Sequence, residues 1–473
     1  MRWTLAQINQ AVAGRIVHAE SLPADMPELV GVATDTRKPC AGQLFIALSG
    51  KRFDAHDYLE VAVRQGAAAL LVSRAENLPP GVPVIRVDDT RLALGRLAAA
   101  WRREFTLPVL AVTGSNGKTT TREMIAAILK TSFGDDAVLT PQGNFNNDIG
   151  LPLTLLQLGT RHRAVVLEMG MNHPGEIRYL ADLARPTAAL VTNAQRAHLE
   201  NMGNLEGVAM EKGNIYSALE ADGVAIINND DPYAENWRRQ NVGRPSLTFA
   251  LDNPADIMGK AVLRGLDTRL VMSMPDGERV ITLQTPGRHN VRNALAAAAA
   301  GLAVGLGLDA LAAGLAAFKG VKGRLQRQAG PYGAVILDDT YNANPDSVRA
   351  GIDVLTSTVG RQILVLGDMG EIGEASGQYH DEIGGYAKSM GVDRLYALGE
   401  ASQQAVRNFA GDARSFKTPE ALVKSLLAEL KSMRKSDRPV TVLVKGSRFM
   451  HMESVVELLK QEAIHQDAEK ENN

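Results

Sequence analysis

The sequence contains a single cysteine, Cys40, among its 473 residues. An intramolecular disulfide is therefore impossible, and nothing indicates an oxidising compartment. Residues 1–17 lack the apolar segment of a signal peptide. The longest uncharged apolar run, 294–308, is rich in Ala and Gly and is short for a membrane span, so it predicts a buried helix that ends near Gly305 or Gly307. These absences predict a cytoplasmic protein that does not insert into a membrane.

An excess of charge of one sign is also missing, because the formal net charge is only -2. This balance argues against general electrostatic attraction to nucleic acid or to an acidic membrane, but it does not exclude the binding of small acidic ligands. Neither a zinc-type cluster of Cys and His nor a repeat of solenoid period occurs in the sequence. A hydrophobic share of 45% and a charged share of 22% are typical of a soluble globular protein. At roughly 150 residues per domain, the length predicts about three domains.

The strongest positive feature is the stretch 109–129, VLAVTGSNGKTTTREMIAAIL. Its first four residues predict a buried strand, and its apolar residues from Met124 onward recur at helical spacing. A strand that turns into a helix through glycines presents backbone N–H groups and the positive end of a helix to an anion. The pattern therefore predicts a loop that binds the phosphates of a nucleoside triphosphate. The loop residues are Gly114, Ser115, Asn116, Gly117, Lys118, Thr119 and Thr120.

The residue types in this loop match the chemistry of phosphate binding. Gly114 and Gly117 remove side chains that would block a phosphate. Lys118 supplies a positive charge for the outer phosphates, and the hydroxyl of Thr119 can ligate Mg²⁺. A strict Walker A motif has glycine where Val112 stands, so the match fails at the first position. A turn without a ligand could contain GSNGKT, but the flanking strand and helix patterns favour nucleotide binding.

Alternating strand and helix patterns predict an α/β protein of three domains. Residues 1–106 predict a small α/β domain, and residues 107–325 a mononucleotide-binding domain whose phosphate loop sits on a central parallel sheet. Residues 326–473 predict a Rossmann-like, doubly wound domain. The glycine-rich segment 320–324 marks the second boundary as a hinge, and the residues after Gln461 lack a sustained apolar pattern and predict a frayed end.

Individual elements can be predicted in the later two domains. A turn at 274–277 between two apolar alternating runs predicts a β-hairpin. The third domain has apolar runs that predict strands at 334–337, 363–366, 395–398 and 440–444, and helical patterns at 347–355, 379–387 and 419–430.

Several polar residues of the middle domain are candidates for a site. An apolar strand ends in Glu168, an arrangement in which a carboxylate holds Mg²⁺ beside a phosphate loop, although a surface residue is the alternative. Taken alone, His198 is more simply a structural histidine, and Lys212 part of a charged helix face. Asn290 and Asn293 lie three residues apart on one helix face and suit either capping or recognition of a base.

Polar segments also mark the two outer domains. In the first domain, 34–37 and 49–56 are either solvated loops or a site for an anionic or sugar-bearing ligand. In the third domain, 338–344, 367–371 and 445–448 follow predicted strands. Ligands gather at the carboxyl ends of the strands in a doubly wound sheet, so these three segments predict a second site.

Taken together, the motifs resemble those of the Mur ligase family, in the family's order and over nearly the whole chain. Each motif is weak alone, but the ordered set is specific. They are TGSNGKTT from Thr113, EMG from Glu168, NAQRAHLE from Asn193, EKGNI from Glu211, GRHNVRNALAA from Gly287, Gly323-Arg324 and DDTYNANP from Asp338. Three more, NFNNDIGLPLTLL from Asn144, LGDMGEIG from Leu366 and LVKGSRFM from Leu443, resemble the member that adds D-alanyl-D-alanine, and the DNPR motif of the tripeptide-forming relative is absent.

The resemblance implies ATP-dependent synthesis of an amide bond. A peptide carboxylate attacks the γ-phosphate to give an acyl phosphate and ADP, and an amine then displaces phosphate from the acyl carbon. The implied acceptor is UDP-MurNAc-tripeptide and the implied donor is D-alanyl-D-alanine. Lys118 and Mg²⁺ would offset the repulsion between the carboxylate and the triphosphate. We expect a monomer without a nucleic-acid partner.

The resemblance also implies the catalytic and metal-binding residues. Thr119 and Glu168 would hold one Mg²⁺, and His198 a second. Lys212 matches a lysine that the family carbamylates with CO₂, which requires a neutral amine and hence a lowered pKa. The carbamate would be a further ligand of the second Mg²⁺. Arg324 would contact the γ-phosphate.

Further implied residues bind the nucleotide and the two substrates. Asn290 and Asn293 would face the adenine, and Asp339 and Tyr341 the nucleoside. The uridine diphosphate end would lie at Asp35, Thr36, Arg37, Ser49, Gly50, Lys51, Asp54 and His56, and the rest of the acceptor at Asn144 and Asn147. Lys445 and Arg448 are candidates for the carboxylate of D-alanyl-D-alanine.

Two alternatives stay open at this point. The chain could be another ligase of the superfamily, such as folylpolyglutamate synthase or a Mur enzyme that adds a different amino acid. It could also be a nucleotide-regulated switch that makes no peptide, although that interpretation leaves Glu168, His198 and Lys212 without a role. Because an acyl phosphate hydrolyses when water reaches it, the ligase interpretation predicts that the third domain swings about 320–323 and closes over the second.

Overall fold

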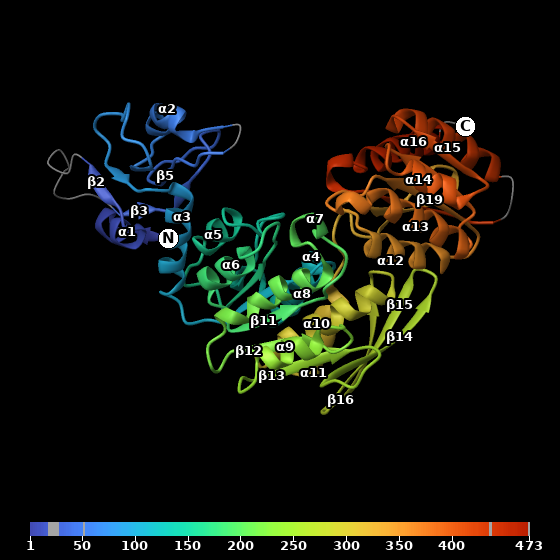
Figure 1. Ribbon diagram of the computed structural model, residues 1–473, viewed down its shortest axis with the longest axis horizontal. Coiled ribbons are helices and arrows are strands. Elements are labelled where there is room, and N and C mark those ends of the chain that lie inside the picture. Colours follow the sequence, from blue (N-terminus) through green and yellow to red (C-terminus); the bar gives the residue numbers. More distant parts are fainter. Residues whose placement is uncertain (18–27, 51–52, 435–437, 472–473) are drawn as a thin grey trace. The chain divides into compact units, whose positions relative to one another are not determined.

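The computed structural model describes residues 1–17, 28–50, 53–434 and 438–471 (Figure 1). Their helices and strands form two compact units, which the chain enters more than once. The first unit contains residues 1–113, 133–189 and 214–224. The second contains residues 114–132, 190–213 and 225–473.

A five-stranded sheet begins the first unit. Its strands are β2 (Arg15–Val17), β4 (Val32–Ala33), β5 (Leu44–Ile46), β6 (Ala69–Val72) and β7 (Val84–Arg86), in the order β2-β7-β6-β5-β4. Strands β4 to β7 are parallel, and β2 is antiparallel to β7. The helices of this part are α1 (Leu5–Val12), α2 (Leu59–Arg64) and α3 (Thr90–Arg102), with a 3₁₀ turn η2 (Ala55–Tyr58) and a two-stranded pair of β1 (Arg2–Trp3) with β3 (Leu29–Val30).

The rest of the first unit carries the strand that leads into the phosphate loop. Strand β10 (Ala164–Glu168) is parallel to both β8 (Val109–Thr113) and β9 (Val138–Leu139). All residues of β8 and β10 are buried, as expected for parallel strands that are covered on both faces. The accompanying elements are η3 (Asp135–Ala137), α5 (Gly150–Leu155), α6 (Glu176–Ala184) and η4 (Asn214–Ala218), and β11 (Ala188–Val191) lies at the division between the units.

The second unit begins with helix α4 (Lys118–Phe133) and continues with a mixed sheet. Strands β12 (Val224–Asn228), β13 (Ser246–Ala250) and β14 (Ile257–Arg264) are parallel, whereas β15 (Asp267–Met274) and β16 (Gly277–Leu283) continue the sheet in antiparallel pairing. The predicted hairpin is confirmed as β15 and β16. This hairpin extends the parallel strands of the middle domain in antiparallel pairing.

Helices accompany this sheet and carry several of the candidate residues. They are α7 (Leu199–Met202), α8 (Leu205–Gly213), α9 (Ala234–Gln240), α10 (Arg288–Ala303) and α11 (Leu308–Ala317). The Ala-rich run forms α10, and most of its side chains are buried, as the sequence predicts. Within the described part of the chain, we find no helix with the length and apolar character needed to cross a bilayer.

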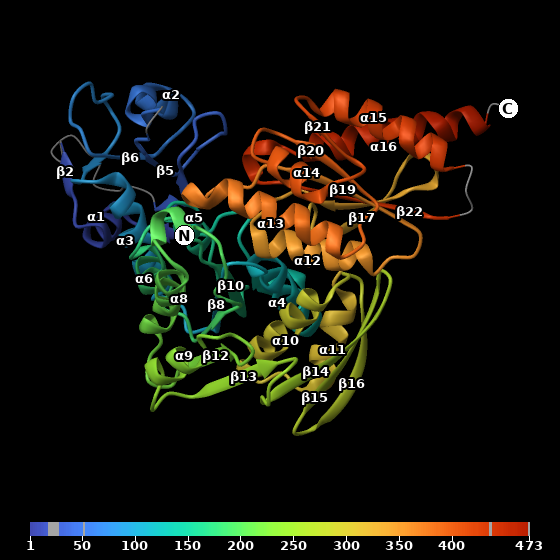
Figure 2. The same cartoon turned by 45° about the vertical axis from the view of Figure 1, so that its right-hand side comes forward.

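The end of the second unit is a six-stranded sheet with helices on both faces (Figure 2). Its strands are β17 (Gln326–Ala329), β18 (Val335–Asp339), β19 (Arg361–Gly367), β20 (Arg394–Leu398), β21 (Ala413–Phe416) and β22 (Val440–Lys445), in the order β17-β18-β22-β19-β20-β21. All neighbours are parallel except β17, which pairs antiparallel with β18 at one edge. The helices are α12 (Pro345–Thr356), α13 (Ser376–Ser389), α14 (Gln403–Phe409), α15 (Pro419–Met433) and α16 (Glu453–Glu471), with 3₁₀ turns η5 (Pro331–Gly333), η6 (Gly373–Ala375) and η7 (Arg448–Met450).

Alternation along the strands explains the two helix layers. Leu337 and Leu364 point into one core, which α12, α13 and α14 complete, whereas their neighbours Ile336 and Ile363 point into another, completed by α15 and α16. The predicted doubly wound arrangement is therefore confirmed. The prediction of a frayed end after Gln461 is wrong, because α16 continues to Glu471.

Candidate functional site

The phosphate loop connects β8 to α4, as the sequence predicts. Gly114 and Gly117 adopt φ angles of 152° and 81°, which disfavour any residue with a side chain. A Cβ atom would collide with the hydroxyl of Thr192 at Gly114 and with the side-chain oxygen of Asn293 at Gly117. The two glycines are thus needed for the loop's own backbone and packing, in addition to the room that they leave for a phosphate.

The segment after β11 holds the loop in shape. The backbone N–H of Ser115 donates to the carbonyl of Asn193 (2.9 Å), and that of Asn116 to the Asn193 side-chain oxygen (2.9 Å). The hydroxyl of Thr192 donates to the Asn116 carbonyl (2.6 Å). Sequence reasoning missed Thr192 and Asn193 as loop supports, although the NAQRAHLE motif begins at Asn193.

The hydrogen bonds of Ser115 and Asn116 limit which backbone N–H groups of the loop can bind an anion. Since Ser115 and Asn116 donate to protein oxygens, the groups at the head of α4 are the better candidates. The N–H of Thr121 donates to the carbonyl of Gly117 (2.8 Å), so residues 118–120 form the first turn of α4. Backbone N–H groups in the first turn of a helix point toward its N-terminus, where anions bind.

Lys118 folds back along the loop that it follows. Its Nζ atom donates to the carbonyl of Gly114 (2.7 Å) and to that of Ser115 (3.3 Å). Its charge is also felt by two neighbours, because it contributes to lowering the pKa of Lys212 and of Glu371. Lys118 is therefore the positive centre of this part of the second unit.

Three of the expected nucleotide residues meet at the start of α4. Arg324 donates from Nη2 to the hydroxyl of Thr119 (2.9 Å), and its guanidinium lies over the ring of Tyr341, 4.3 Å from the centroid. The N–H of Tyr341 donates to the carbonyl of Gly323 (3.1 Å). The hinge segment predicted from the sequence thus places an arginine on the phosphate loop.

Asn290 and Asn293 lie in the first two turns of α10, and both are buried. Asn293 donates to the side-chain oxygen of Asn290 (3.1 Å), and Asn290 donates to the carbonyl of Pro286 (2.8 Å). This chain of amides reaches Gly117, where Asn293 fills the space that a side chain would need. The pair predicted from the spacing therefore packs against the phosphate loop.

Lys212 is not on a charged helix face, because only 1% of it is exposed. It lies in the last turn of α8. Burial lowers the pKa of Lys212 well below its ordinary value, the charge of Lys118 lowers it further, and Glu211 opposes the shift. Burial and the charge of Lys118 thus favour the neutral, nucleophilic form of this amine over the charged form.

His198 adopts a left-handed backbone conformation with a φ of 57°, just before α7. Its Nδ1 atom lies 3.0 Å from the Oε2 atom of Glu371, which is also left-handed, with a φ of 60°. The hydrogen bond from His198 lowers the pKa of Glu371 in spite of burial. Since Nδ1 faces a carboxylate, Nε2 is the atom left for another ligand. The sequence analysis included Glu371 in the polar segment 367–371 but gave it no role of its own.

Glu168 ends β10 in the first unit, with 1% of it exposed. The side chain of Asn146 donates to Glu168 Oε1 (2.9 Å) and to Asn144 Oδ1 (2.7 Å). Asn147 accepts the backbone N–H of Gly150 (2.9 Å) at the beginning of α5. Asn144 is thus connected to Glu168 through Asn146, which the sequence analysis missed, whereas Asn147 supports a helix.

A connected cluster forms in the loop 49–56. The N–H of Ser73 donates to His56 Nε2 (3.0 Å), so the neutral ring carries its proton on Nδ1, which lies 2.7 Å from Asp54 Oδ1. The hydroxyl of Ser49 donates to the same oxygen (3.0 Å), and Arg74 pairs with Asp54 Oδ2 (2.7 Å). Burial alone would raise the pKa of Asp54, but the hydrogen bonds of His56 and Ser49 hold it at about 2.

The other first-domain loop forms a separate ion pair. Arg37 Nη2 lies 2.8 Å from Asp35 Oδ2, and the side chain of Arg37 is 88% exposed. The hydrogen bonds from Arg37 lower the pKa of Asp35 to about 2. Thr36 lies between these two residues in the sequence. In the loop 49–56, Gly50 donates its N–H to the carbonyl of Phe53 (2.8 Å), and Lys51 lies outside the described residues.

The two residues expected to bind the donor have different surroundings. Lys445 is buried, and its Nζ atom donates to Asp339 Oδ2 (2.6 Å) and to the carbonyl of Asn342 (3.0 Å). Asp339 and Lys445 are register partners on β18 and β22, so the sheet brings together two residues that were predicted for different ligands. Arg448 is exposed and pairs with Glu453 (2.8 Å).

Within the described residues, no group of three or more His, Cys, Asp or Glu side chains is arranged to hold a metal ion. Thr119 offers a hydroxyl in the first turn of α4, and Glu168 offers a carboxylate at the end of β10. Oxygen ligands of these kinds are those that Mg²⁺ prefers.

Three sequence profiles match the chain in succession. Residues 28–102 match the catalytic domain of the Mur ligase family, residues 112–301 the Mur ligase middle domain, and residues 323–448 the Mur ligase glutamate ligase domain. Their order agrees with the three α/β domains expected from the sequence.

Individual relatives match over almost the full length. The UDP-N-acetylmuramoyl-tripeptide--D-alanyl-D-alanine ligase of Escherichia coli (strain K12) is 42% identical over 461 residues, which are 97% of this chain and 98% of that protein. A crystal structure of MurF from Acinetobacter baumannii is 34% identical, with a TM-score of 0.90 over 98% of this chain and 99% of that one. The MurF ligase of Thermotoga maritima, solved in complex with ADP, is 27% identical, with a TM-score of 0.81 over 92% and 98% of the two chains.

Proposed function

Because the chain belongs to the Mur ligase family, we propose that it is an ATP-dependent ligase that joins D-alanyl-D-alanine to UDP-MurNAc-tripeptide. The product is the UDP-MurNAc-pentapeptide used in peptidoglycan synthesis. The observation that carries this proposal is the 42% identity to the E. coli ligase of that name over 97% of the chain. The phosphate loop with Arg324, Tyr341 and the buried amides of α10 supports the use of ATP.

The reaction proceeds in two steps, a phosphoryl transfer and an acyl transfer. A carboxylate oxygen of the acceptor peptide bonds to the γ-phosphorus of ATP, the bond from that phosphorus to the β,γ-bridging oxygen breaks, and ADP leaves. The amine of D-alanyl-D-alanine then bonds to the acyl carbon and loses a proton, and the bond from that carbon to the phosphate oxygen breaks, releasing phosphate. The first step brings an anionic carboxylate to an anionic triphosphate, and in the second step negative charge develops on the acyl oxygen and on the departing phosphate. Fixed positive charge stabilises both steps.

The chain supplies that charge at the head of α4. Lys118 and Arg324 neutralise the outer phosphates, and the N–H groups of 118–120 bind phosphate oxygens. Asn290 and Asn293 contact the adenine. This assignment is supported by the packing of Asn293 against Gly117, by its hydrogen bond to Asn290, and by the hydrogen bond from Arg324 to Thr119.

Mg²⁺ adds charge neutralisation at the phosphates when it is bound. Thr119 and Glu168 would hold one ion, and His198 and Lys212 would hold a second. For Lys212 this role requires a carbamate, in which the neutral amine bonds to the carbon of CO₂ and releases a proton. The burial and lowered pKa of Lys212 support this chemistry.

The other substrate sites follow from the remaining polar clusters. The cluster of Ser49, Asp54 and His56 binds the uridine diphosphate end of the acceptor, together with the segment 35–37, and Asn144 contacts the rest of the acceptor. D-alanyl-D-alanine binds the third domain near Lys445 and Arg448. Both residues have a carboxylate partner, but Lys445 is buried with Asp339 whereas Arg448 is exposed beside Glu453, so Arg448 is the stronger candidate for the donor carboxylate.

The domains divide this work at the boundaries expected from the sequence. Residues 1–106 bind the acceptor, 107–325 bind ATP, and 326–473 bind the donor and close over ATP by a swing about 320–323. A cytoplasmic location and a monomeric state stay predictions.

A competition assay tests the choice of donor. The purified protein is given ATP, UDP-MurNAc-tripeptide and equal concentrations of D-alanyl-D-alanine, glutamate and a diamino acid, and the products are identified by mass spectrometry. The proposal predicts that the acceptor gains only the mass of the dipeptide. A product that carries glutamate or the diamino acid would establish another ligase of the superfamily, and the absence of any product would favour the nucleotide switch.

A further inference from the structure

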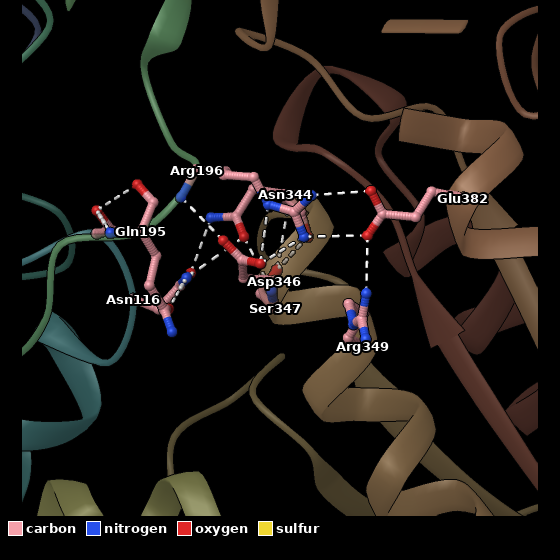
Figure 3. A network of polar contacts seen from close by, with 9 residues as sticks. Asn116, Gln195, Arg196, Asn344, Asp346, Ser347, Arg349 and Glu382 are labelled. Atoms are coloured by element: carbon pink, nitrogen blue, oxygen red, sulfur yellow. Dashed lines mark hydrogen bonds and ion pairs between the residues drawn. The ribbon is translucent and has the colours of Figure 1, made fainter. Parts of the chain in front are cut away.

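Arg196 makes the most extensive ion-pair contacts among the described residues around the phosphate loop (Figure 3). It lies in the segment between β11 and α7, two residues before His198. Its Nη2 atom lies 2.6 Å from Asp346 Oδ1, and its Nη1 atom 2.9 Å from Glu382 Oε2. Its backbone N–H also donates to Asp346 Oδ2 (2.9 Å). One residue is thus bound through both backbone and side chain to α12 and α13.

A second contact connects the phosphate loop to the same helix (Figure 3). The side chain of Asn344 donates to Asn116 Oδ1 (2.8 Å), and Asn116 donates to Gln195 Oε1 (2.7 Å). Asn344 also caps α12, because its side-chain oxygen accepts the backbone N–H of Ser347 (2.9 Å). The beginning of α12 therefore contacts the phosphate loop through Asn344 and the segment that carries His198 through Asp346.

The two contacts have a shared consequence. Helix α12 can accept Arg196 and Asn116 together only when the phosphate loop, the segment 193–198 and the third domain are correctly placed. Interactions of this kind contribute to a reaction by fixing the geometry of groups that act on the substrate. Neither Arg196 nor Asp346 needs to touch ATP, the acceptor or the donor for such an effect.

We propose that Arg196 and Asp346, supported by Glu382 and by the pair of Asn116 with Asn344, are positioning residues that hold the phosphate loop and His198 against the third domain during acyl transfer. The inference rests on the proposed ligase function and adds residues that act through other groups. It predicts that loss of the contact slows turnover and leaves the first binding of ATP to the loop nearly intact.

The chain offers a matched control within the same network. Arg349 lies on α12 and pairs with Glu382 on α13 (2.9 Å), and its guanidinium lies over Tyr386. Both partners of this pair belong to the third domain. Arg349→Gln therefore removes an ion pair of similar length from the same acidic residue without removing a contact to the segment 193–198.

The test compares Asp346→Asn, Arg196→Lys, their double variant and Arg349→Gln with the unaltered full-length protein. For each we measure kcat and KM with ATP, UDP-MurNAc-tripeptide and D-alanyl-D-alanine, the Kd of a non-hydrolysable ATP analogue by calorimetry, and the thermal unfolding profile. Asn344→Ser is added because serine keeps the helix cap but is too short to reach Asn116.

We expect kcat to fall about 10- to 100-fold in Asp346→Asn and Arg196→Lys, as for other misplaced catalytic groups, with the Kd of the analogue within about threefold. The effects of the two single changes should not multiply in the double variant, because both changes disturb the same ion pair between Arg196 and Asp346. Arg349→Gln should keep its kcat. Asn344→Ser should also lower kcat at unchanged unfolding temperature.

Three results would overturn the inference. They are an unchanged kcat in Asp346→Asn, a loss of kcat that appears equally in Arg349→Gln, and effects of the two single changes that multiply in the double variant. Unfolding profiles identify a variant that fails to fold. If Asp346→Asn or Arg196→Lys fails to fold, the kcat of Asn344→Ser decides, and an unchanged kcat in that variant would overturn the inference. If the unaltered protein releases no phosphate in the presence of both substrates, it is the ligase function that fails.

Discussion

Replacing Gly117 by alanine perturbs the phosphate loop in a way that the structure allows us to quantify. Gly117 has a φ of 81°, and a left-handed conformation costs a residue with a side chain about 1–2 kcal/mol. The new Cβ would also collide with Asn293, whose hydrogen bond to Asn290 must then break or bend. The loss of a buried hydrogen bond adds about 1 kcal/mol. The total is about 2–3 kcal/mol against the loop conformation that binds phosphate.

This cost should appear in nucleotide affinity. If only the native loop conformation binds ATP, a penalty of about 2–3 kcal/mol raises the apparent Kd by about 30- to 140-fold. Calorimetric titration with a non-hydrolysable ATP analogue measures the change.

Gly134 provides the control for Gly117→Ala. It follows α4 with a φ of 96°, and a Cβ built there meets no atom within 4 Å. Gly134→Ala should therefore pay the conformational cost in stability and leave the affinity for nucleotide unchanged. A Kd for Gly117→Ala within threefold of the unaltered protein would refute the reasoning, and so would an equal loss of affinity in Gly134→Ala.

Three other predictions concern the first unit, Lys212 and the hinge. Lys212→Ala should lose activity and regain part of it with added short carboxylic acids, which supply the missing anion; a fully active variant would remove the carbamate role. Because the pKa of Asp54 is lowered to about 2, its contribution to stability is present above about pH 4 and is lost as the pH falls toward 2. Asp54→Asn should accordingly unfold at a lower temperature than the unaltered protein at pH 7, and a difference that does not shrink below pH 4 would contradict the assignment. Small-angle scattering should show compaction when nucleotide and acceptor are both present, and an unchanged radius of gyration would exclude the swing about 320–323.

Local sequence patterns were sufficient to predict the phosphate loop and most strands and helices of the third domain. The signals for the loop are contiguous, because the apolar strand, the two glycines and Lys118 all lie within ten residues. The alternating strands of the third domain are also contiguous signals, and their predicted helices lie within a few residues of α12, α13 and α15.

Local patterns could not predict contacts between residues that are far apart in the sequence. His198 meets Glu371, and Asp339 meets Lys445, only because crossover connections place their elements side by side. The burial of Lys212 likewise depends on elements that pack around α8.

Tertiary contacts also explain why the prediction of a frayed end after Gln461 is wrong. The polar residues after Gln461 give no helix signal of their own, yet α16 continues through them. Leu459 anchors the helix in the core, and Gln466 accepts the backbone N–H of Tyr332 (2.9 Å). Packing of this kind regularly overrides local preference.

The central claim is that this phosphate loop delivers a γ-phosphate to a peptide carboxylate for attack by an amine. Release of phosphate by the purified protein, measured with ATP and Mg²⁺ while UDP-MurNAc-tripeptide and D-alanyl-D-alanine are each included or omitted, tests it most directly. The account predicts sustained release only when both are present, with loss of that release in Lys118→Ala. Sustained release that does not depend on D-alanyl-D-alanine, or none under any combination, would contradict it.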